Sequence, residues 1–303
     1  MITRDVDAFL RFARACPADF GPTTAKAAFL VAPEGFALAA QSASDNRYMD
    51  LALQTNAERA LAEHRALHAA LSESLPAICF PGALDTPDAQ FPNNVFATAP
   101  GRLILGHMRH PVRQREVERP DIRKFFTDTL GYREIDLRAQ PGFCELTGAL
   151  VIDHARGLGL IGLSERCDER GAAAMHEAFG LRASLLFNLA PGEYHSNVVL
   201  SVLAGRAVVI APEGFADAAV VSALSELYAP HAVLLSAAEK AGFAGNCIAL
   251  SEHDVWMSRT AEMALQPAHR AALEAAGFRV RSVVLAEIEK AGGSLRCCVA
   301  EIF

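Results

Sequence analysis

An internal repeat constrains the fold of this chain more than any other feature of its sequence. Four segments share one pattern: an Asn or Gly, alternating apolar residues, a turn of small residues and a second apolar run. Each is typical of a β-hairpin, because apolar residues flank a turn that is polar or contains glycine. The four segments are residues 93–107, 147–163, 196–211 and 245–259.

A helix and a third strand are expected after most of these hairpins. Apolar residues recur at helical spacing in 168–180, 214–229 and 266–277, and residues 115–130 form a further expected helix. Short strand-like runs follow at 132–137, 183–189, 232–237 and 280–286. The repeating unit is therefore strand, strand, helix and strand.

The spacing of the units predicts a closed arrangement. The residues that open successive first strands lie 54, 49, 49 and 51 residues apart; they are Asn94, Gly148, Asn197, Asn246 and Cys297. The fifth unit starts with LRCCVAEIF at 295–303, so its remaining elements must come from the N-terminal segment 25–33. This completion predicts an α/β five-bladed propeller of pseudo-fivefold ββαβ repeats, closed into a ring without exposed sheet edges. An unrelated α/β sheet with coincidental spacing is the alternative.

Composition and charge exclude several classes of protein. The chain has 303 residues and a net charge of −7, and its Lys and Arg residues are scattered, which speaks against nucleic-acid binding. Its apolar stretches are too short and too interrupted to span a membrane. Asp5 and Asp7 lie where a secretory signal would be apolar. Seven cysteines without paired or zinc-like spacing favour free thiols in a cytoplasmic protein, with no metal site and no cofactor.

One glycine motif is set aside. GLGLIG, at residues 157–162, fits the Gly-x-Gly-x-x-Gly pattern of dinucleotide-binding folds. That pattern requires a strand before it and a helix directly after it. Here it spans a hairpin turn and the second strand, so it predicts no dinucleotide site.

Three residues in equivalent places of three units could perform thiol chemistry. Cys297 opens the last unit, His195 precedes a first strand, and Glu145 lies at the matching place one unit earlier. Taken singly, each residue has an ordinary explanation. A His at the start of a strand is more often a structural residue, a Glu is usually solvated, and a Cys in an apolar run usually belongs to the core. Together they supply the nucleophile, base and carboxylate of covalent catalysis. Cys297 is preferred to Cys298 because strand neighbours face opposite ways and only one faces the centre.

These segments resemble the guanidino-group-modifying superfamily, whose five-bladed propeller is called the pentein fold. GGSLRC, EYHSN and ELTG are similar to the Cys, His and Glu motifs of that superfamily. FPNNVFAT, LSERCDE and FAGNCIALS look more like an arginine-deiminase-related subgroup that includes citrulline-utilisation hydrolases. The resemblance covers roughly residues 26–303. It implies a single catalytic domain at 25–303, preceded by an N-terminal extension at 1–24.

The resemblance implies a mechanism. Cys297 attacks the central carbon of a guanidino or ureido group, and His195 protonates the departing nitrogen before it activates water. Glu145 holds the substrate nitrogens or orients His195. A cationic substrate, a charged His195 or the neighbouring Arg296 could lower the pKa of the thiol.

Two departures from the arginine deiminase pattern bear on the substrate. Asn94 and Asn197 stand where those enzymes have carboxylates that clasp the guanidinium. An Asn amide both donates and accepts, so it suits a neutral ureido group, and citrulline is the favoured substrate, giving ornithine, ammonia and carbon dioxide. Glu145 alone, or Asp88 as a second carboxylate, could still offset a cation.

The amino-acid head of the substrate needs further contacts. Arg166 is the candidate for the α-carboxylate, although a surface salt bridge would also explain it. Asp88 or Asn46 could receive the α-amino group. Asn246 and Arg296, which flank the nucleophile in the repeat register, complete the expected substrate-binding set.

Other activities remain open at this stage. An arginine deiminase, a dimethylarginine hydrolase or an amidinotransferase would use the same thiol chemistry. A non-catalytic binding propeller is a further alternative, but it predicts loss of the Cys, His or Glu. The expected partner is a small amino acid with a ureido or guanidino group, with no nucleic acid or membrane, and a homodimer could form.

Overall fold

Five separate sheets with the same strand pairing build the computed structural model, which describes residues 1–303. In each sheet the middle strand pairs antiparallel with the first strand and parallel with the third. Their strands are β4 (Phe96–Ala99), β5 (Arg102–Leu105) and β6 (Arg133–Asp136); β7 (Leu150–Asp153), β8 (Leu158–Leu163) and β9 (Ala183–Asn188); β10 (Leu200–Leu203), β11 (Ala207–Ile210) and β12 (Ala232–Leu234); β13 (Ile248–Ala249), β14 (Asp254–Ser258) and β15 (Arg279–Val283); and β16 (Ala300–Ile302), β2 (Ala27–Val31) and β3 (Ala77–Phe80). The four predicted hairpins are confirmed, and GLGLIG belongs to β8 and the turn before it.

The two ends of the chain meet in the last of these sheets. β16 pairs antiparallel with β2, and Ala300 lies opposite Phe29. The prediction that the segment 25–33 supplies the second strand of the last unit is therefore confirmed, but the third strand, β3, lies beyond that segment at Ala77–Phe80. The five sheets do not join into one closed sheet, however. Their first strands meet only by packing, since β16 contacts β4 and β10 contacts both β7 and β13 without a hydrogen-bonded ladder.

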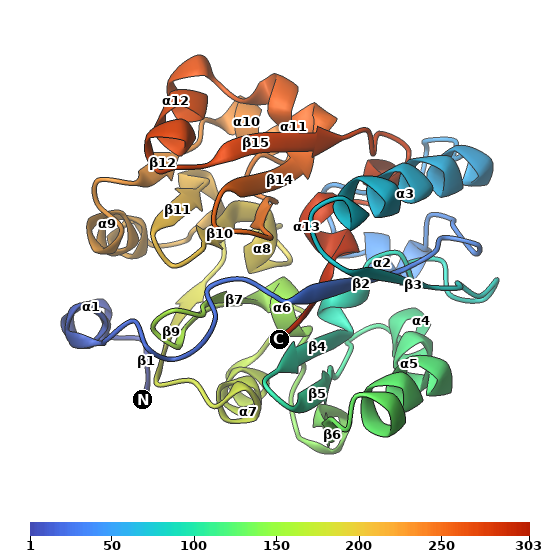
Figure 1. Ribbon diagram of the computed structural model, residues 1–303, viewed down its shortest axis with the longest axis horizontal. Helices are drawn as coiled ribbons and strands as arrows, with labels where there is room; N and C mark the ends of the chain where they lie inside the picture. The colour runs from blue at the N-terminus through green and yellow to red at the C-terminus, as the bar shows by residue number, and fades with distance from the viewer.

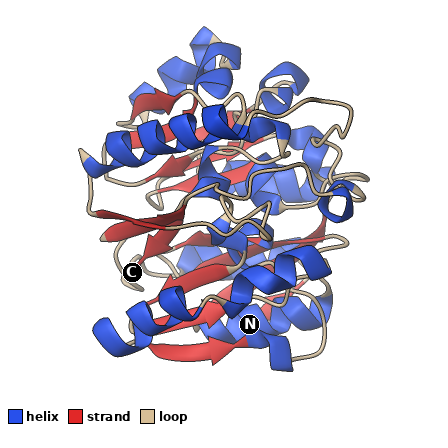
Figure 2. Cartoon of the chain, turned by 90° about the vertical axis from the view of Figure 1, so that its right-hand side faces the viewer, coloured by secondary structure: helices blue, strands red, loops and turns tan.

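Most helices lie outside the sheets (Figure 1). They are α3 (Ala57–Ser72), α7 (Glu169–Phe179), α9 (Ala218–Leu227), α12 (Pro267–Ala275) and the shorter α4 (Pro111–Gln114), α5 (Pro120–Lys124), α10 (Ala237–Ala241) and α11 (Arg259–Ala264). The short α2 (Ala40–Ala43) lies further in, beside β2. Their ends follow ordinary capping rules: Asp168 caps α7 by accepting from the Gly171 N–H, and Gly180 ends it in the left-handed region. Seen from the side, the strands form tiers with helices above and below them (Figure 2).

The residues predicted to open first strands lie mostly in short helical turns instead. These turns are η1 (Pro92–Asn94), α6 (Leu146–Ala149), α8 (Ser196–Val199) and α13 (Leu295–Cys298). Cys297 and Cys298 thus share a helical turn, and the strand-alternation argument for choosing between them was wrong. The turns gather at the centre, where α6 contacts both α8 and η1, and η1 contacts α13.

The expected helix at 115–130 is broken. A 3-10 turn (η2, Arg115–Glu118) precedes α5, and a π-helical turn (η3, Phe125–Thr129) follows it. Pro120 causes the break, because proline has no N–H to donate and is accepted at the first helical position. The remaining 3-10 turns are η4 (Leu137–Ala139), η5 (Pro212–Gly214) and η6 (Ile288–Lys290).

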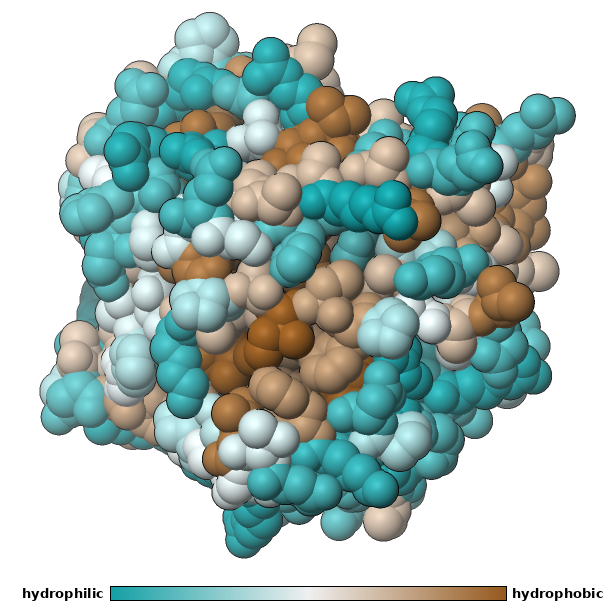
Figure 3. Space-filling view, turned by 45° about the vertical axis from the view of Figure 1, so that its right-hand side comes forward, coloured by the Kyte–Doolittle hydropathy of each residue, from teal (hydrophilic) through white to brown (hydrophobic).

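The first residues of the chain pack on one of the sheets. β1 (Ile2–Thr3) pairs in parallel with β9 and extends that sheet to four strands. α1 (Val6–Ala15) contacts β9 and α9, and buries Phe9 and Ala13. None of the helices is long and apolar enough to cross a membrane. On the side that carries α3 and α5, apolar residues gather in a hollow edged by polar ones (Figure 3).

Replacement of Ile302 by Ala tests the joining of the two chain ends. Ile302 lies in β16, is 2% exposed and packs in the core cluster that contains Phe29 and Leu103. We expect Ile302→Ala to lower the free energy of unfolding by about 3 kcal/mol, measured by urea denaturation. Val284→Ala, at a position that is 54% exposed, is the control and should change it by less than about 0.5 kcal/mol. Equal effects of the two substitutions would contradict a stabilising role for this strand.

Candidate active site

A pocket of about 260 Å³ reaches the centre of the molecule at Cys297. It brings together five of the residues predicted from the sequence, and these come from four separate segments. They are Asn46, Asp88, Asn94, Arg166 and Cys297. The remaining lining residues are Ser42, Met49, Phe91, Arg113, Tyr194, Ala291 and Gly293.

Glu145 and His195 form a fully buried pair beside this pocket. The Nε2 atom of His195 lies 2.8 Å from the Oε2 atom of Glu145. Burial alone would raise the pKa of Glu145, but Arg166 and His195 outweigh it and hold that pKa well below its usual range. Burial lowers the pKa of His195 although Glu145 opposes this. The resting pair is therefore a carboxylate and a neutral imidazole that donates its Nε2 proton.

The other ring nitrogen of His195 is free to exchange a proton. Nδ1 is buried and has no hydrogen-bond partner in the protein. Because Nε2 carries the proton shared with Glu145, Nδ1 is the unprotonated nitrogen and can accept one. The arrangement resembles a general base held in one tautomer by a carboxylate.

Gly148 makes room for the imidazole ring. A Cβ atom at Gly148 would lie 2.7 Å from both the Nδ1 and Cε1 atoms of His195. No side chain can occupy that space unless the ring moves. A glycine is therefore needed in the ELTG segment for a steric reason, since a larger residue would displace His195. The sequence alone did not reveal this requirement.

Two asparagines contact the thiol of Cys297. The Nδ2 atom of Asn246 donates to Sγ at 3.3 Å, and Sγ donates to the Oδ1 atom of Asn197 at 3.8 Å. Asn246 also accepts from the backbone N–H of Arg296 at 3.0 Å, so its amide fixes the turn that carries the cysteine. Burial raises the pKa of Cys297, against the Ser294 backbone and Asn246, which lower it. The thiol is therefore protonated when the pocket is empty.

Arg113 sets the orientation of Asn94. Its Nη2 atom donates to the Oδ1 atom of Asn94 at 2.8 Å, and Glu116 holds the same guanidinium through two bonds of 2.8 Å. The Nδ2 atom of Asn94 makes no hydrogen bond within the protein, so the pocket is offered an N–H donor at this place. Burial raises the pKa of Glu116 to about 7, although Arg113 opposes this.

Asp88 presents a free carboxylate oxygen. Its Oδ2 atom accepts from the Ser42 hydroxyl at 2.5 Å, whereas its Oδ1 atom is buried and has no partner in the protein. Burial raises the pKa of Asp88, against Arg113 and Ser42, which lower it. A buried carboxylate without a full set of partners is costly, so this oxygen points to a cationic or donor group in the ligand.

Arg166 is buried in the pocket wall and is already paired. Its Nη2 atom lies 2.6 Å from the Oδ1 atom of Asp45 and donates to the Ser42 carbonyl at 2.7 Å. Its Nη1 atom lies 3.4 Å from the Oε2 atom of Glu145. The surface-salt-bridge alternative for Arg166 is wrong, since its side chain is 2% exposed.

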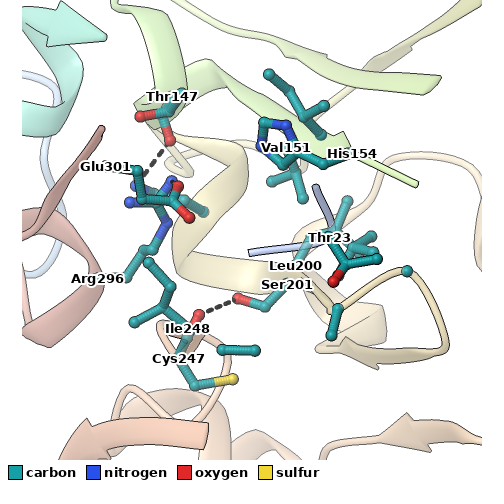
Figure 4. A pocket seen from close by; sticks show the side chains of 16 residues that line it. Thr23, Thr147, Val151, His154, Leu200, Ser201, Cys247, Ile248, Arg296 and Glu301 are labelled. Atoms are coloured by element: carbon teal, nitrogen blue, oxygen red, sulfur yellow. Dashed lines mark hydrogen bonds and ion pairs between the residues drawn. The ribbon is translucent and has the colours of Figure 1, made fainter. Parts of the chain in front are cut away.

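Arg296 does not join the pocket. Its guanidinium turns to Glu301, at 2.9 Å, and to the Val299 carbonyl, also at 2.9 Å. Both charged side chains line a second cavity of about 500 Å³ (Figure 4), which also contains Thr147 and Ser201. Asn197 lines this cavity as well, and it lies between the second cavity and Cys297.

The sequence did not point to three residues in or beside the pocket. Arg113 lines the pocket from the short helix α4, and Asp45 lies in a loop and pairs with Arg166 of the pocket wall. Neither belongs to the repeat register, so no positional signal identified them. Tyr194 precedes His195, and its ring packs on both the imidazole and the Arg166 guanidinium, with separations of 4.5 and 5.0 Å. Its only sequence signal was its place next to the candidate base.

Comparison with known proteins identifies the family. A family model described as N,N dimethylarginine dimethylhydrolase, eukaryotic, matches residues 32–303. The chain belongs to the N,N dimethylarginine dimethylhydrolase family. It is thereby a member of the guanidino-group-modifying (pentein) superfamily and a hydrolase of non-peptide C–N bonds. The N(G),N(G)-dimethylarginine dimethylaminohydrolase of Mycobacterium tuberculosis is 29% identical over 263 residues, which cover 85% of this chain and 80% of that protein.

Solved structures share the fold of this dimethylhydrolase family member. The N-terminal domain of ArgZ, an arginine dihydrolase from cyanobacteria, gives a TM-score of 0.78 at 20% identity and covers 91% of this chain and 97% of that domain. A dimethylarginine dimethylaminohydrolase in an adduct with S-methyl-L-thiocitrulline gives a TM-score of 0.71 at 21% identity, with 92% and 100% covered. The α/β fold is therefore that of pentein enzymes.

Replacement of Gly148 by Ala tests the placement of His195. The added methyl group must displace the imidazole from Glu145, so we expect kcat for guanidino hydrolysis to fall by about 100-fold. Stopped assays of ammonia or amine release measure it, and thermal unfolding confirms that the variant folds. Gly21→Ala is the control, because a Cβ there meets only the His154 carbonyl at 3.9 Å. A Gly148→Ala protein with full activity would contradict this role.

Proposed function

We propose that this protein hydrolyses the guanidino group of free arginine or of an N-methylated arginine through a covalent intermediate on Cys297. The observation that carries this proposal is the free Oδ1 atom of Asp88 in the wall of the Cys297 pocket. A guanidinium supplies both the positive charge and the N–H donors that such an oxygen lacks. This preference differs from the citrulline substrate favoured by the sequence.

The charges around the pocket support a cationic substrate. Arg113 pairs with Glu116, and Arg166 pairs with Asp45 and lies near Glu145. Asp88 lines the same pocket without an ion-pair partner, and one of its oxygens is free. A guanidinium side chain supplies the positive charge that this carboxyl group lacks, whereas a ureido group is neutral and does not.

The thiol becomes reactive when the substrate binds. In the empty pocket burial raises the pKa of Cys297, which keeps the nucleophile protonated. A guanidinium placed beside the sulfur favours the thiolate, and the thiol proton passes to the neutral His195. Cys297 therefore becomes a strong nucleophile only when the substrate is bound.

The proposed reaction has two steps. The Cys297 sulfur forms a bond to the central guanidino carbon, one C–N bond breaks, and His195 gives its proton to the departing nitrogen. Water then adds to the same carbon and loses a proton to His195, and the C–S bond breaks to release a ureido product. Glu145 stabilises the imidazolium in both steps, and Asn246 and Asn197 hold the sulfur in place.

The amino-acid head would be held at the outer part of the pocket. Arg166 is the proposed partner of the α-carboxylate, which must then replace Asp45 on its guanidinium. Asp88 and Asn46 line the same pocket, and Asn46 already bonds to the backbone of Tyr48 and Gly292. Arg296 has no proposed contact with substrate, because it faces the other cavity.

A ureido substrate remains a second candidate because of Asn94. Arg113 occupies the oxygen of the Asn94 amide, which leaves an N–H donor facing the pocket. A guanidinium has no acceptor for this donor, whereas the oxygen of citrulline does. Citrulline hydrolysis to ornithine, ammonia and carbon dioxide is therefore a proposal of its own.

Further predictions from the sequence stand as proposals. The common strand pairing and the β16–β2 contact support a five-bladed propeller. The single domain at 25–303, the cytoplasmic location and the homodimer rest on the sequence, and the apolar hollow in Figure 3 offers a surface for a second copy. Amidinotransfer would require an amine acceptor in place of water.

A substrate panel tests the proposed function. Arginine, dimethylarginine and citrulline are incubated in parallel, and ammonia, amine and ureido products are measured. We expect turnover of arginine or dimethylarginine, and a fall of at least about 1,000-fold in Cys297→Ala. Cys79→Ala, at an exposed cysteine, is the matched control and should keep full activity. Turnover of citrulline alone would overturn the guanidino proposal and support the second candidate.

Replacement of Asp88 by Asn tests the charge argument. The amide keeps the shape of the side chain but removes its negative charge. We expect kcat/KM for guanidino substrates to fall by about 10- to 100-fold, mostly through KM, while citrulline turnover does not fall. Asp85→Asn, at an exposed carboxylate three positions away, is the control. Equal losses of kcat/KM for charged and neutral substrates would show that Asp88 stabilises the pocket and does not bind the guanidinium through its charge.

A further inference from the structure

The geometry points to the second cavity as the route by which hydrolytic water reaches the intermediate on Cys297. This inference rests on the proposed function and adds a path to it. The cavity lies on the other side of Asn197 from the pocket, and its walls come mainly from the first strands of neighbouring sheets, β7, β10, β13 and β16. Figure 4 shows Val151, Ser201, Arg296 and Glu301 around it.

A second route is needed because the substrate occupies the first. The pocket at Cys297 is small, about 260 Å³, and the residues proposed to hold the head of the substrate line it. The covalent intermediate still occupies this pocket when water must arrive. Water that came the same way would have to pass the intermediate.

The second cavity suits water. The Arg296–Glu301 ion pair lines it, together with the Ser201 and Thr147 hydroxyls. These hydroxyls donate to backbone carbonyls but can still accept a hydrogen bond from water. Eight of the 16 lining residues are hydrophobic. The space in it that water can occupy is about 40 Å³, which is room for more than one water molecule. Polar cavities of this kind hold ordered water, whereas apolar ones stay dry.

The partition between the cavity and the thiol is one side chain thick. Asn197 lines the cavity, and its Oδ1 atom lies 3.8 Å from the Cys297 sulfur. Its Nδ2 atom donates to the Thr147 carbonyl at 3.0 Å, and Asn93 donates to the same carbonyl at 3.4 Å. The Oδ1 atom of Asn93 is buried and has no partner in the protein. A buried amide oxygen without a hydrogen-bond partner, surrounded by other amides, is a place where a water molecule can bind.

The path would serve the second step of the reaction alone. Formation of the C–S bond and release of the amine consume no water. Water then adds to the carbon, His195 takes a proton from it, and the C–S bond breaks. Blocking the second cavity should therefore slow breakdown of the intermediate and leave its formation intact.

Substitutions that enlarge side chains in the wall of the second cavity test this route. Val151→Phe places a ring in the space seen in Figure 4, and Val202→Phe does so from the neighbouring strand β10. Val284→Phe, at an exposed residue away from both cavities, is the matched control. Rapid-quench mass spectrometry with arginine and dimethylarginine measures the fraction of enzyme in the covalent adduct, and steady-state assays measure kcat.

We expect adduct to accumulate in both cavity variants, with kcat lowered by about tenfold and the rate of adduct formation changed by less than about twofold. Thermal unfolding shows which variants fold, and only those are compared. Normal kcat without accumulated adduct in either folded variant would overturn the route. If the unmodified protein gave neither adduct nor product, the proposed function would fail, and the route with it.

Discussion

The antiparallel pairing of β16 with β2 joins the two ends of the chain, and the position of the nucleophile depends on it. Cys297 lies in the turn directly before β16, so the ladder to β2 holds that turn at the centre. This turn, α13, contacts η1, and η1 contacts α6, the turn that follows Glu145. Loss of the β16–β2 pairing would free an edge of the sheet and release Cys297, the proposed nucleophile.

A network of amides connects the elements that meet at the centre. Asn246 bonds to the Asn197 carbonyl and to the Cys297 sulfur, and Asn197 and Asn93 both bond to the Thr147 carbonyl. Neutral amides can satisfy buried backbone groups without the desolvation cost of charges. The charged groups stand around them, where Glu145 polarises the imidazole and Arg113 orients Asn94. The residues that hold the centre together are therefore also those of the proposed active site.

The sequence predicted the hairpins and the completion of the last unit because these depend on local alternation, turn residues and spacing. It did not predict the helical turns that carry Asn94, Gly148 and Cys297, because segments of three or four residues are too short to show the spacing of apolar residues that is typical of a helix. It overlooked Arg113 and Asp45 for another reason. Asp45 lies on a loop and Arg113 in the short helix α4, and neither position belongs to the repeated pattern that points to the centre.

The sequence by itself determined which chemical groups are present, their order, and the repeat register that places Glu145, His195 and Cys297 at equivalent points of three units. Only the tertiary structure decided which partner each polar group takes. Arg296, next to the nucleophile in sequence, turns to Glu301, while Asp88 keeps one oxygen free for a ligand. The physical reason is that pairing and burial depend on contacts between residues far apart in the chain, and the sequence places the groups without fixing those contacts.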